Sequence, residues 1–132
     1  MKKDIESKKD IVKLVDAFYA KVTADEMIGF IFTEKASINW GQHLPIMYSF
    51  FENMLLYTGS YTGNPMELHK HVNRLYPLTV EHFSRWIHLF ESTVDDLFAG
   101  KKAELAKQRT KSIAAVMQIK IFNNTSSSDK IF

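Results

Sequence analysis

Cysteine is absent from this 132-residue chain. A disulfide framework, a thiolate metal site and a thiol nucleophile are therefore excluded. Any bound metal must be held by histidine or carboxylate side chains. A chain without disulfides suits the reducing cytosol, so we expect a cytoplasmic protein.

Long apolar runs and an excess of one charge sign are also lacking. No eighteen consecutive residues are apolar, and no apolar stretch follows the basic residues of the first ten positions. We therefore expect neither a membrane span nor a signal peptide. The 17 Lys and Arg residues nearly balance the 15 Asp and Glu residues, leaving a net charge of +2. This balance is too even to predict binding to nucleic acid or to a membrane surface.

The chain does contain apolar side chains that recur every three or four residues. Ser7 and Asp10 resemble a capping box before an apolar stripe from Ile11 to Val22, which predicts a helix over residues 8–23. Further helices are predicted at 25–32, from Ser37 through Leu55, after Pro65, from Thr79 to Gly100, and at 101–122. No strand pair is predicted. The expected fold is all-α, with two antiparallel helix pairs able to enclose a ligand.

Two segments interrupt this pattern. Pro45 falls within the third predicted helix and is expected to kink it or to confine its regular part to the residues that follow. The polar segment 123–132 follows the last apolar stripe and is expected to be disordered. We therefore expect one domain over residues 1–122 and a C-terminal tail over 123–132.

The five histidines stand at positions 43, 69, 71, 82 and 88. His69 and His71 are two residues apart, so on a helix their side chains point about 200° apart and do not bind one ion together. No pair of histidines has the i, i+4 spacing of a zinc site, and no nearby carboxylate completes a triad. The arrangement is compatible with a site that needs one protein ligand, with a porphyrin supplying the remaining coordination.

Two segments carry a resemblance to a known family. Residues 59–69, GSYTGNPMELH, and residues 77–90, PLTVEHFSRWIHLF, resemble the signature of group III truncated haemoglobins. Phe18-Tyr19, Ile31-Phe32 and residues 40–55 follow the order and spacing of the same family. The resemblance covers roughly residues 8–120 and implies a truncated globin fold, a two-over-two helical sandwich around haem.

The resemblance also implies the roles of individual residues. The resemblance implies that His69 is the iron ligand. It also implies that the residues on the opposite, distal side of haem b (iron protoporphyrin IX), which stabilise the bound ligand, are Tyr19, His43 and Trp86. A phenol O–H, an indole N–H and an imidazole N–H are suitable donors to iron-bound oxygen, which carries partial negative charge. The implied walls of the haem pocket are apolar: Phe18, Phe32, Met47, Phe51, Met54, Leu68, Phe83 and Phe90.

The function expected from this resemblance is binding of oxygen, or of NO or CO, at a five-coordinate iron. One alternative uses the same pocket for catalysis, as a nitric oxide dioxygenase or a peroxidase, and requires an electron-donating reductase that the chain itself does not supply. A second alternative belongs to a different class. It is a helical interaction module without a cofactor, in which the aromatic stripes are core and the histidines have no common role.

Overall fold

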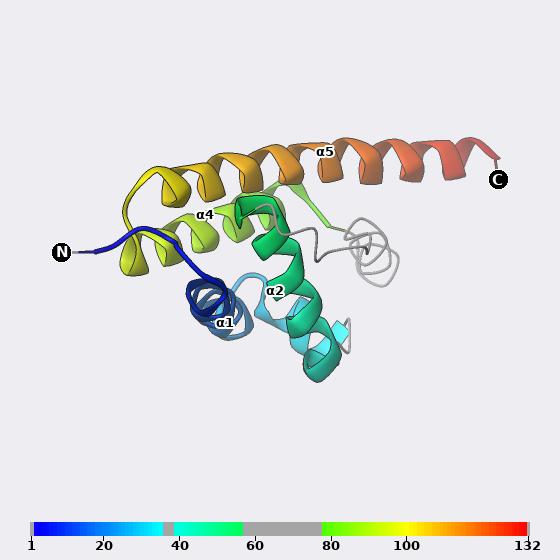
Figure 1. Cartoon of the computed structure of the whole chain (residues 1–132). Helices are drawn as coiled ribbons and strands as arrows, with labels where there is room; N and C mark the ends of the chain where they lie inside the picture. The colour runs from blue at the N-terminus through cyan, green and yellow to red at the C-terminus, as the bar shows by residue number, and fades with distance from the viewer. Residues whose placement is uncertain (1, 36–38, 57–77, 132) are drawn as a thin grey trace.

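The computed structural model describes residues 2–35, 39–56 and 78–131, except for the side chains of residues 34–35 and 120–131. Its helices are α1 (Lys8–Ala24), the π-helix η1 (Ile31–Lys35), α2 (Trp40–Leu56), α4 (Val80–Leu97) and α5 (Lys101–Ile131). Figure 1 shows α4 and α5 side by side and antiparallel, with α1 and α2 packed beneath them. The described ranges contain no β-strand, which agrees with the predicted all-α class. None of their helices is both long and apolar enough to cross a membrane.

Helix α1 forms where its apolar stripe predicted it and supplies the centre of the core. Its buried side chains follow the i, i+3, i+4 spacing and include Leu14, Phe18 and Val22. The predicted capping box lacks the hydrogen bond from the Ser7 side chain. Ser7 is the N-cap residue but makes no side-chain hydrogen bond, whereas the Asp10 carboxylate accepts the backbone N–H of Glu6 at 2.9 Å.

The second helix differs from the sequence prediction. Residues 26–28 form a turn, and η1 begins at Ile31, so the helix predicted over 25–32 is displaced along the chain. The physical reason is the carboxylate of Asp25, whose Oδ2 accepts the backbone N–H groups of Met27 and Ile28 at 3.0 and 3.1 Å. These bonds hold residues 26–28 in a turn and cap the helical residues that begin at Gly29.

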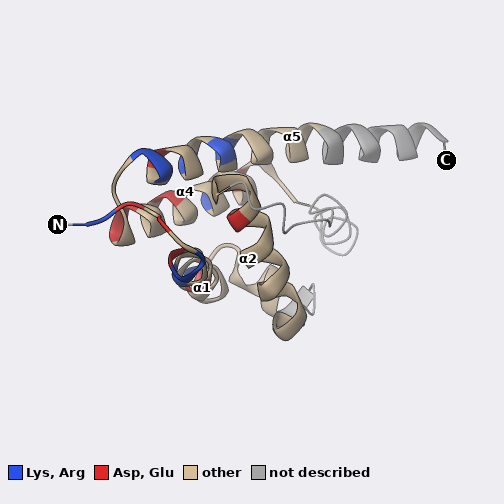
Figure 2. Ribbon diagram, viewed as in Figure 1, with Lys and Arg blue, Asp and Glu red and all other residues tan. Residues whose placement is uncertain are grey.

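Helix α2 is continuous through Pro45, so its regular part is not confined to the residues after the proline. The predicted cap, Ser37, lies outside the described residues. Asn39 performs this role instead, because its side-chain oxygen accepts the backbone N–H of Gln42 at 3.3 Å. Glu52 is the one charged residue of α2, which makes α2 the least charged of the long helices; Figure 2 shows most of its ribbon in the colour of uncharged residues.

Helix α4 starts as predicted at the cap Thr79. Its hydroxyl accepts the backbone N–H of His82, and the His82 ring accepts the backbone N–H of Thr79 at 3.0 Å, which completes a capping box. Helix α5 continues to Ile131, through the polar segment expected to be disordered. Neither glycine nor proline occurs after Gly100, so the sequence contains no strong helix breaker there. The domain boundary at residue 122 stays a prediction.

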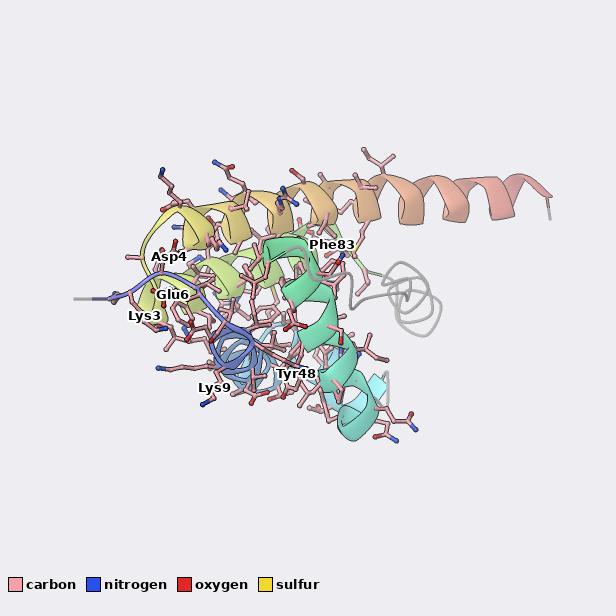
Figure 3. All side chains as sticks on the ribbon, viewed as in Figure 1. Lys3, Asp4, Glu6, Lys9, Tyr48 and Phe83 are labelled. Atoms are coloured by element: carbon pink, nitrogen blue, oxygen red, sulfur yellow. The ribbon has the colours of Figure 1, made fainter. Side chains whose placement is uncertain are left out.

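The N-terminal segment lies against the start of α5 and caps this helix. Both carboxylate oxygens of Asp4 accept backbone N–H groups at 2.9 Å, from Lys102 and from Ala103. Figure 3 shows Asp4 beside the first turn of this helix. Gly100 has φ +143°, and a Cβ at this position would lie 2.5 Å from Asp4 Cγ. Glycine is therefore required here by both the backbone conformation and the contact.

The core is built around a chain of aromatic rings. The rings of Phe51 and Phe90 are stacked, with centroids 5.4 Å apart, and join α2 to α4. Phe18 of α1 meets the edge of Phe90 at 5.2 Å. Phe18 and Phe90 are fully buried and hold three helices together at one point.

Candidate functional site

Two polar side chains meet inside the apolar core. The hydroxyl oxygen of Tyr19, on α1, lies 3.4 Å from Nε2 of His43, on α2. Only 5% of Tyr19 and 7% of His43 is exposed. The sequence predicted a shared role for these residues, and the structure brings them together.

Burial fixes the protonation state of Tyr19. Removal of the phenol from water raises the pKa of Tyr19 well above its ordinary value, because the phenolate is poorly solvated in the core. The hydroxyl therefore keeps its proton at every physiological pH. Tyr19 is a permanent hydrogen-bond donor as well as an acceptor.

Trp40 covers this pair and was not selected from the sequence. Its ring centroid lies 5.2 Å from that of Tyr19 and 5.7 Å from that of His43. The position of Trp40 three residues before His43 places both on one face of α2, which is the signal that could have identified it.

An open groove between α1 and α2 is lined in part by Tyr19 and Trp40. The whole groove is lined by Asp16, Tyr19, Ala20, Thr23, Trp40, Leu44 and Tyr48. Tyr48 donates its hydroxyl hydrogen to Asp16 at the edge of this groove. Tyr19 therefore faces His43 on one side and contributes to a solvent-accessible surface on the other.

Trp86, the third predicted distal residue, lies on α4 and reaches the pair through Phe18. The Phe18 ring centroid is 5.0 Å from Tyr19 and 5.4 Å from Trp86. Trp86 also forms a wall shared by two pockets. This arrangement makes Trp86 a partition between neighbouring apolar spaces.

These two pockets contain about half of the predicted wall residues. The first is lined by Ile28, Ile31, Phe32, Leu78, His82, Phe83 and Trp86. The second is lined by Met47, Phe50, Phe51, Trp86, Thr110, Ile113 and Met117. Phe18, Met54 and Phe90 are buried in the core and line neither pocket.

The remaining predictions for the site concern histidines and one leucine. His69, the predicted iron ligand, and its neighbour Leu68 lie outside the described residues. His82 belongs to the cap of α4, and His88 is exposed. Within residues 2–35, 39–56 and 78–131, no three histidine or carboxylate side chains are grouped closely enough to hold a metal ion.

The donor set fits a flat apolar cofactor that brings its own metal coordination. Aromatic and aliphatic side chains line both pockets beside Trp86, and the Tyr19–His43 pair provides polar groups at an otherwise apolar core. Such a pocket favours porphyrin, whose ring is apolar, over a small hydrated cation. The described part of the site is therefore compatible with haem.

Comparison with known proteins gives a consistent result. A family model described as bacterial-like globin matches residues 3–123. The group 3 truncated hemoglobin ctb of Campylobacter jejuni is 31% identical over 121 residues, which cover 89% of this chain and 93% of that protein. The crystal structure of group III truncated hemoglobin from Campylobacter jejuni matches with a TM-score of 0.77 at 30% identity, covering 92% of this chain and 95% of that chain. This match confirms the fold predicted from the sequence.

Proposed function

Since the chain belongs to the bacterial-like globin family, we propose that it binds haem b through His69 and uses it to bind oxygen or another diatomic gas. The observation that carries this proposal is the buried contact between Tyr19 and His43. A hydroxyl and an imidazole in an apolar core are costly unless they are hydrogen-bonded, and they suit a ligand with partial negative charge. Haem supplies the iron that coordinates such a ligand.

The direction of the hydrogen bond decides which group faces the ligand. When the Tyr19 O–H donates to Nε2 of His43, its only proton is used within the protein. When Nε2 of His43 carries the proton and donates to Tyr19, the phenol O–H is available to the ligand. We propose the second arrangement for the ligand-bound protein, because each bond in such a chain polarises and strengthens the next.

The apolar walls have a different role, which is to exclude water. Phe32, Phe83 and Trp86 line one pocket, and Met47 and Phe51 line the other together with Trp86. In an environment without competing water, a single hydrogen bond to the ligand is stronger than it is in solvent. We propose that the Trp86 indole N–H adds a third donor.

The same pocket supports a catalytic use. Oxidation of nitric oxide by oxygen to nitrate consumes one electron per turnover, so a reductase must restore the protein after each cycle. The paired donors favour this use because they retain oxygen long enough to meet a second reactant. We propose a cytoplasmic setting, where such reductases are found and where a cysteine-free chain is at no disadvantage.

An absorption spectrum of the purified full chain tests the proposal. We expect a Soret band after addition of haemin, and we expect His69→Ala to abolish it or to weaken it strongly. His88→Ala is the matched control, because His88 is exposed on α4. A colourless protein that does not respond to haemin would support the cofactor-free helical module and overturn the proposal.

A further inference from the structure

The carboxylate of Asp25 joins two segments that are 60 residues apart in the chain. Its Oδ1 accepts hydrogen bonds from Nε and Nη2 of Arg85 at 2.8 and 2.6 Å, and its Oδ2 accepts the backbone N–H groups of Met27 and Ile28. These bonds use both lone pairs of each oxygen. The side chain of Asp25 is 3% exposed, so α4 and the turn after α1 meet at a buried, fully bonded carboxylate.

The two segments that meet at Asp25 form walls of the same pocket, which lies beside η1. The residues that line it after the turn are Ile28, Ile31 and Phe32, and those on α4 include Phe83 and Trp86. Ile28 donates its backbone N–H to Asp25, and Trp86 follows Arg85 directly in the chain. The carboxylate is therefore bonded to each wall within one residue of a side chain that lines the pocket.

An ion pair at this place is informative because apolar packing would hold the two segments at least as firmly. The desolvation of a buried charged pair offsets most of its attraction, so well-packed apolar side chains of similar volume are often as stabilising. Arginine adds directed donors in a rigid plane, and these fix the distance and the angle between the partners. The pair between Asp25 and Arg85 thus supplies a fixed geometry between the turn and α4.

Trp86 depends on this geometry because packing fixes its ring only in part. The ring meets Phe18 in an edge-to-face contact, with centroids 5.4 Å apart. The same ring borders two pockets, and a side chain beside empty space is held less tightly than one enclosed by a close-packed core. The position of the indole therefore depends on where α4 lies relative to the turn.

We propose that Asp25 and Arg85 are positioning residues for Trp86. Their ion pair fixes the first half of α4 against the turn after α1, and it thereby holds the indole N–H where it can donate to a bound ligand. The inference rests on the proposed function, in which Trp86 is the third donor on the distal side. Asp25 and Arg85 act through Trp86 and are assigned no contact with the ligand.

The indole N–H signals of the protein test the proposal, because the chain has two tryptophans. The proton–nitrogen correlation spectrum of the haem-loaded, CO-bound full chain should contain two indole peaks, which Trp86→Phe and Trp40→Phe assign. We expect Asp25→Asn to move or broaden the Trp86 peak and to leave the Trp40 peak in place, since Trp40 lies on α2 beside Tyr19. Glu26→Gln is the matched control, because it removes an exposed carboxylate from the same turn, and it should move neither peak.

The C–O stretching frequency of the same complex measures the effect on the ligand. A hydrogen-bond donor beside bound CO lowers this frequency, so loss of the Trp86 donor should raise it. We expect Asp25→Asn to raise the frequency as Trp86→Phe does, and to add no further shift when the two are combined. Arg85→Lys keeps the charge and should lie closer to wild type than Arg85→Gln. The two Arg85 variants keep the proposal testable if Asp25→Asn does not fold.

The outcomes separate this inference from the proposed function. A chain without a Soret band refutes the proposed function. A chain that binds haem and CO, but in which Asp25→Asn and Arg85→Gln leave the Trp86 peak and the C–O frequency at their wild-type values, refutes the positioning role alone. Equal shifts of both indole peaks would also overturn it, because they would show a general loosening of the fold and no specific link to Trp86.

Discussion

Tyr19 Oη and His43 Nε2 lie 3.4 Å apart although 24 residues separate them in the chain. The distance is longer than that of a strong O–H···N bond, so the contact is readily exchanged for one to a ligand. Both residues are buried, Tyr19 on α1 and His43 on α2, and the exchange requires no unwinding of either helix. The predictions on ligand binding depend on this relationship.

Replacement of Tyr19 by Phe should speed the release of oxygen. The variant keeps the ring and its packing but loses the donor, and one hydrogen bond is worth on the order of 1 kcal/mol, which corresponds to about a fivefold faster dissociation. Stopped-flow displacement of oxygen by CO measures this rate. Tyr48→Phe is the control, since Tyr48 loses a hydroxyl bound to Asp16 at the edge of the open groove. Equal rates in Tyr19→Phe and wild type would contradict the proposed donor role.

Trp40 should control how fast gas reaches the distal residues. Its ring lies against both Tyr19 and His43 at the groove, so Trp40→Ala is expected to raise the association rate of CO severalfold. If Trp40 acts through His43, the double variant with His43→Ala should be no faster than the faster single variant. Association rates that remain at the wild-type value in both single variants would show that ligands enter elsewhere.

Asp25 and Arg85 should make stability fall in acid. Arg85 donates from Nε and Nη2 to one oxygen of Asp25, at 2.8 and 2.6 Å, and the Asp25 side chain is 3% exposed. The hydrogen bonds from Arg85 hold the pKa of Asp25 below its ordinary value, and they outweigh the effect of burial. The folded-state pKa is thus lower than the unfolded one. The contribution of Asp25 to the free energy of unfolding is therefore present above the unfolded pKa of about 3.9. It is lost as the pH falls through the folded-state pKa.

Asp25→Asn isolates this contribution. We expect a loss of about 1–3 kcal/mol in the free energy of unfolding near pH 7, because the amide leaves the Arg85 contact without its charge. Urea titrations at pH 7 and pH 3 measure it, and the difference between variant and wild type should shrink at the lower pH. Asp96→Asn is the control, since Asp96 pairs with Lys21 at an exposed site, where water and salt screen the pair, and its loss should be much smaller. Equal losses in the two variants would contradict the assignment.

Gly100→Ala should be among the more destabilising glycine substitutions. The residue has φ +143°, and its new Cβ would meet the Asp4 side chain. We expect a loss of more than about 1 kcal/mol from backbone strain together with disruption of the cap. Chemical denaturation measures the loss, and Gly41→Ala is the control because the nearest atom to its Cβ is the side-chain oxygen of Asn39 at 3.4 Å. If Gly100→Ala left the free energy of unfolding unchanged, the N-terminal segment would be free to move aside.

Local signals predicted much of the fold. The stripe of α1, the cap at Thr79 and the break at Gly100 each depend on residues within one or two turns, and the structure has them where the sequence placed them. Features that join distant segments were missed. The ion pair of Asp25 with Arg85 joins the turn after α1 to α4, and no residue near Asp25 in the sequence indicates a partner 60 residues later.

The roles predicted for the site residues stay predictions. Tyr19 and His43 came from the family resemblance and meet in the structure, whereas their spacing in the chain says nothing about a contact. Trp40 and Asp25 were not singled out for the site, because a tryptophan on an apolar stripe is an ordinary residue of a core and an aspartate is ordinarily exposed. Only the contacts of Trp40 and the burial and partners of Asp25 distinguish them.

The Asp4 cap has a consequence for the order of events during synthesis. The Asp4 carboxylate leaves the ribosome about a hundred residues before the amides that it binds. The Asp4 carboxylate therefore stays without these partners until the first turn of α5 has emerged, and α5 gains its N-terminal cap only after α1, α2 and α4 have been synthesised. A bulky fusion placed directly before Asp4 would therefore disturb the start of a helix about a hundred residues away in the sequence.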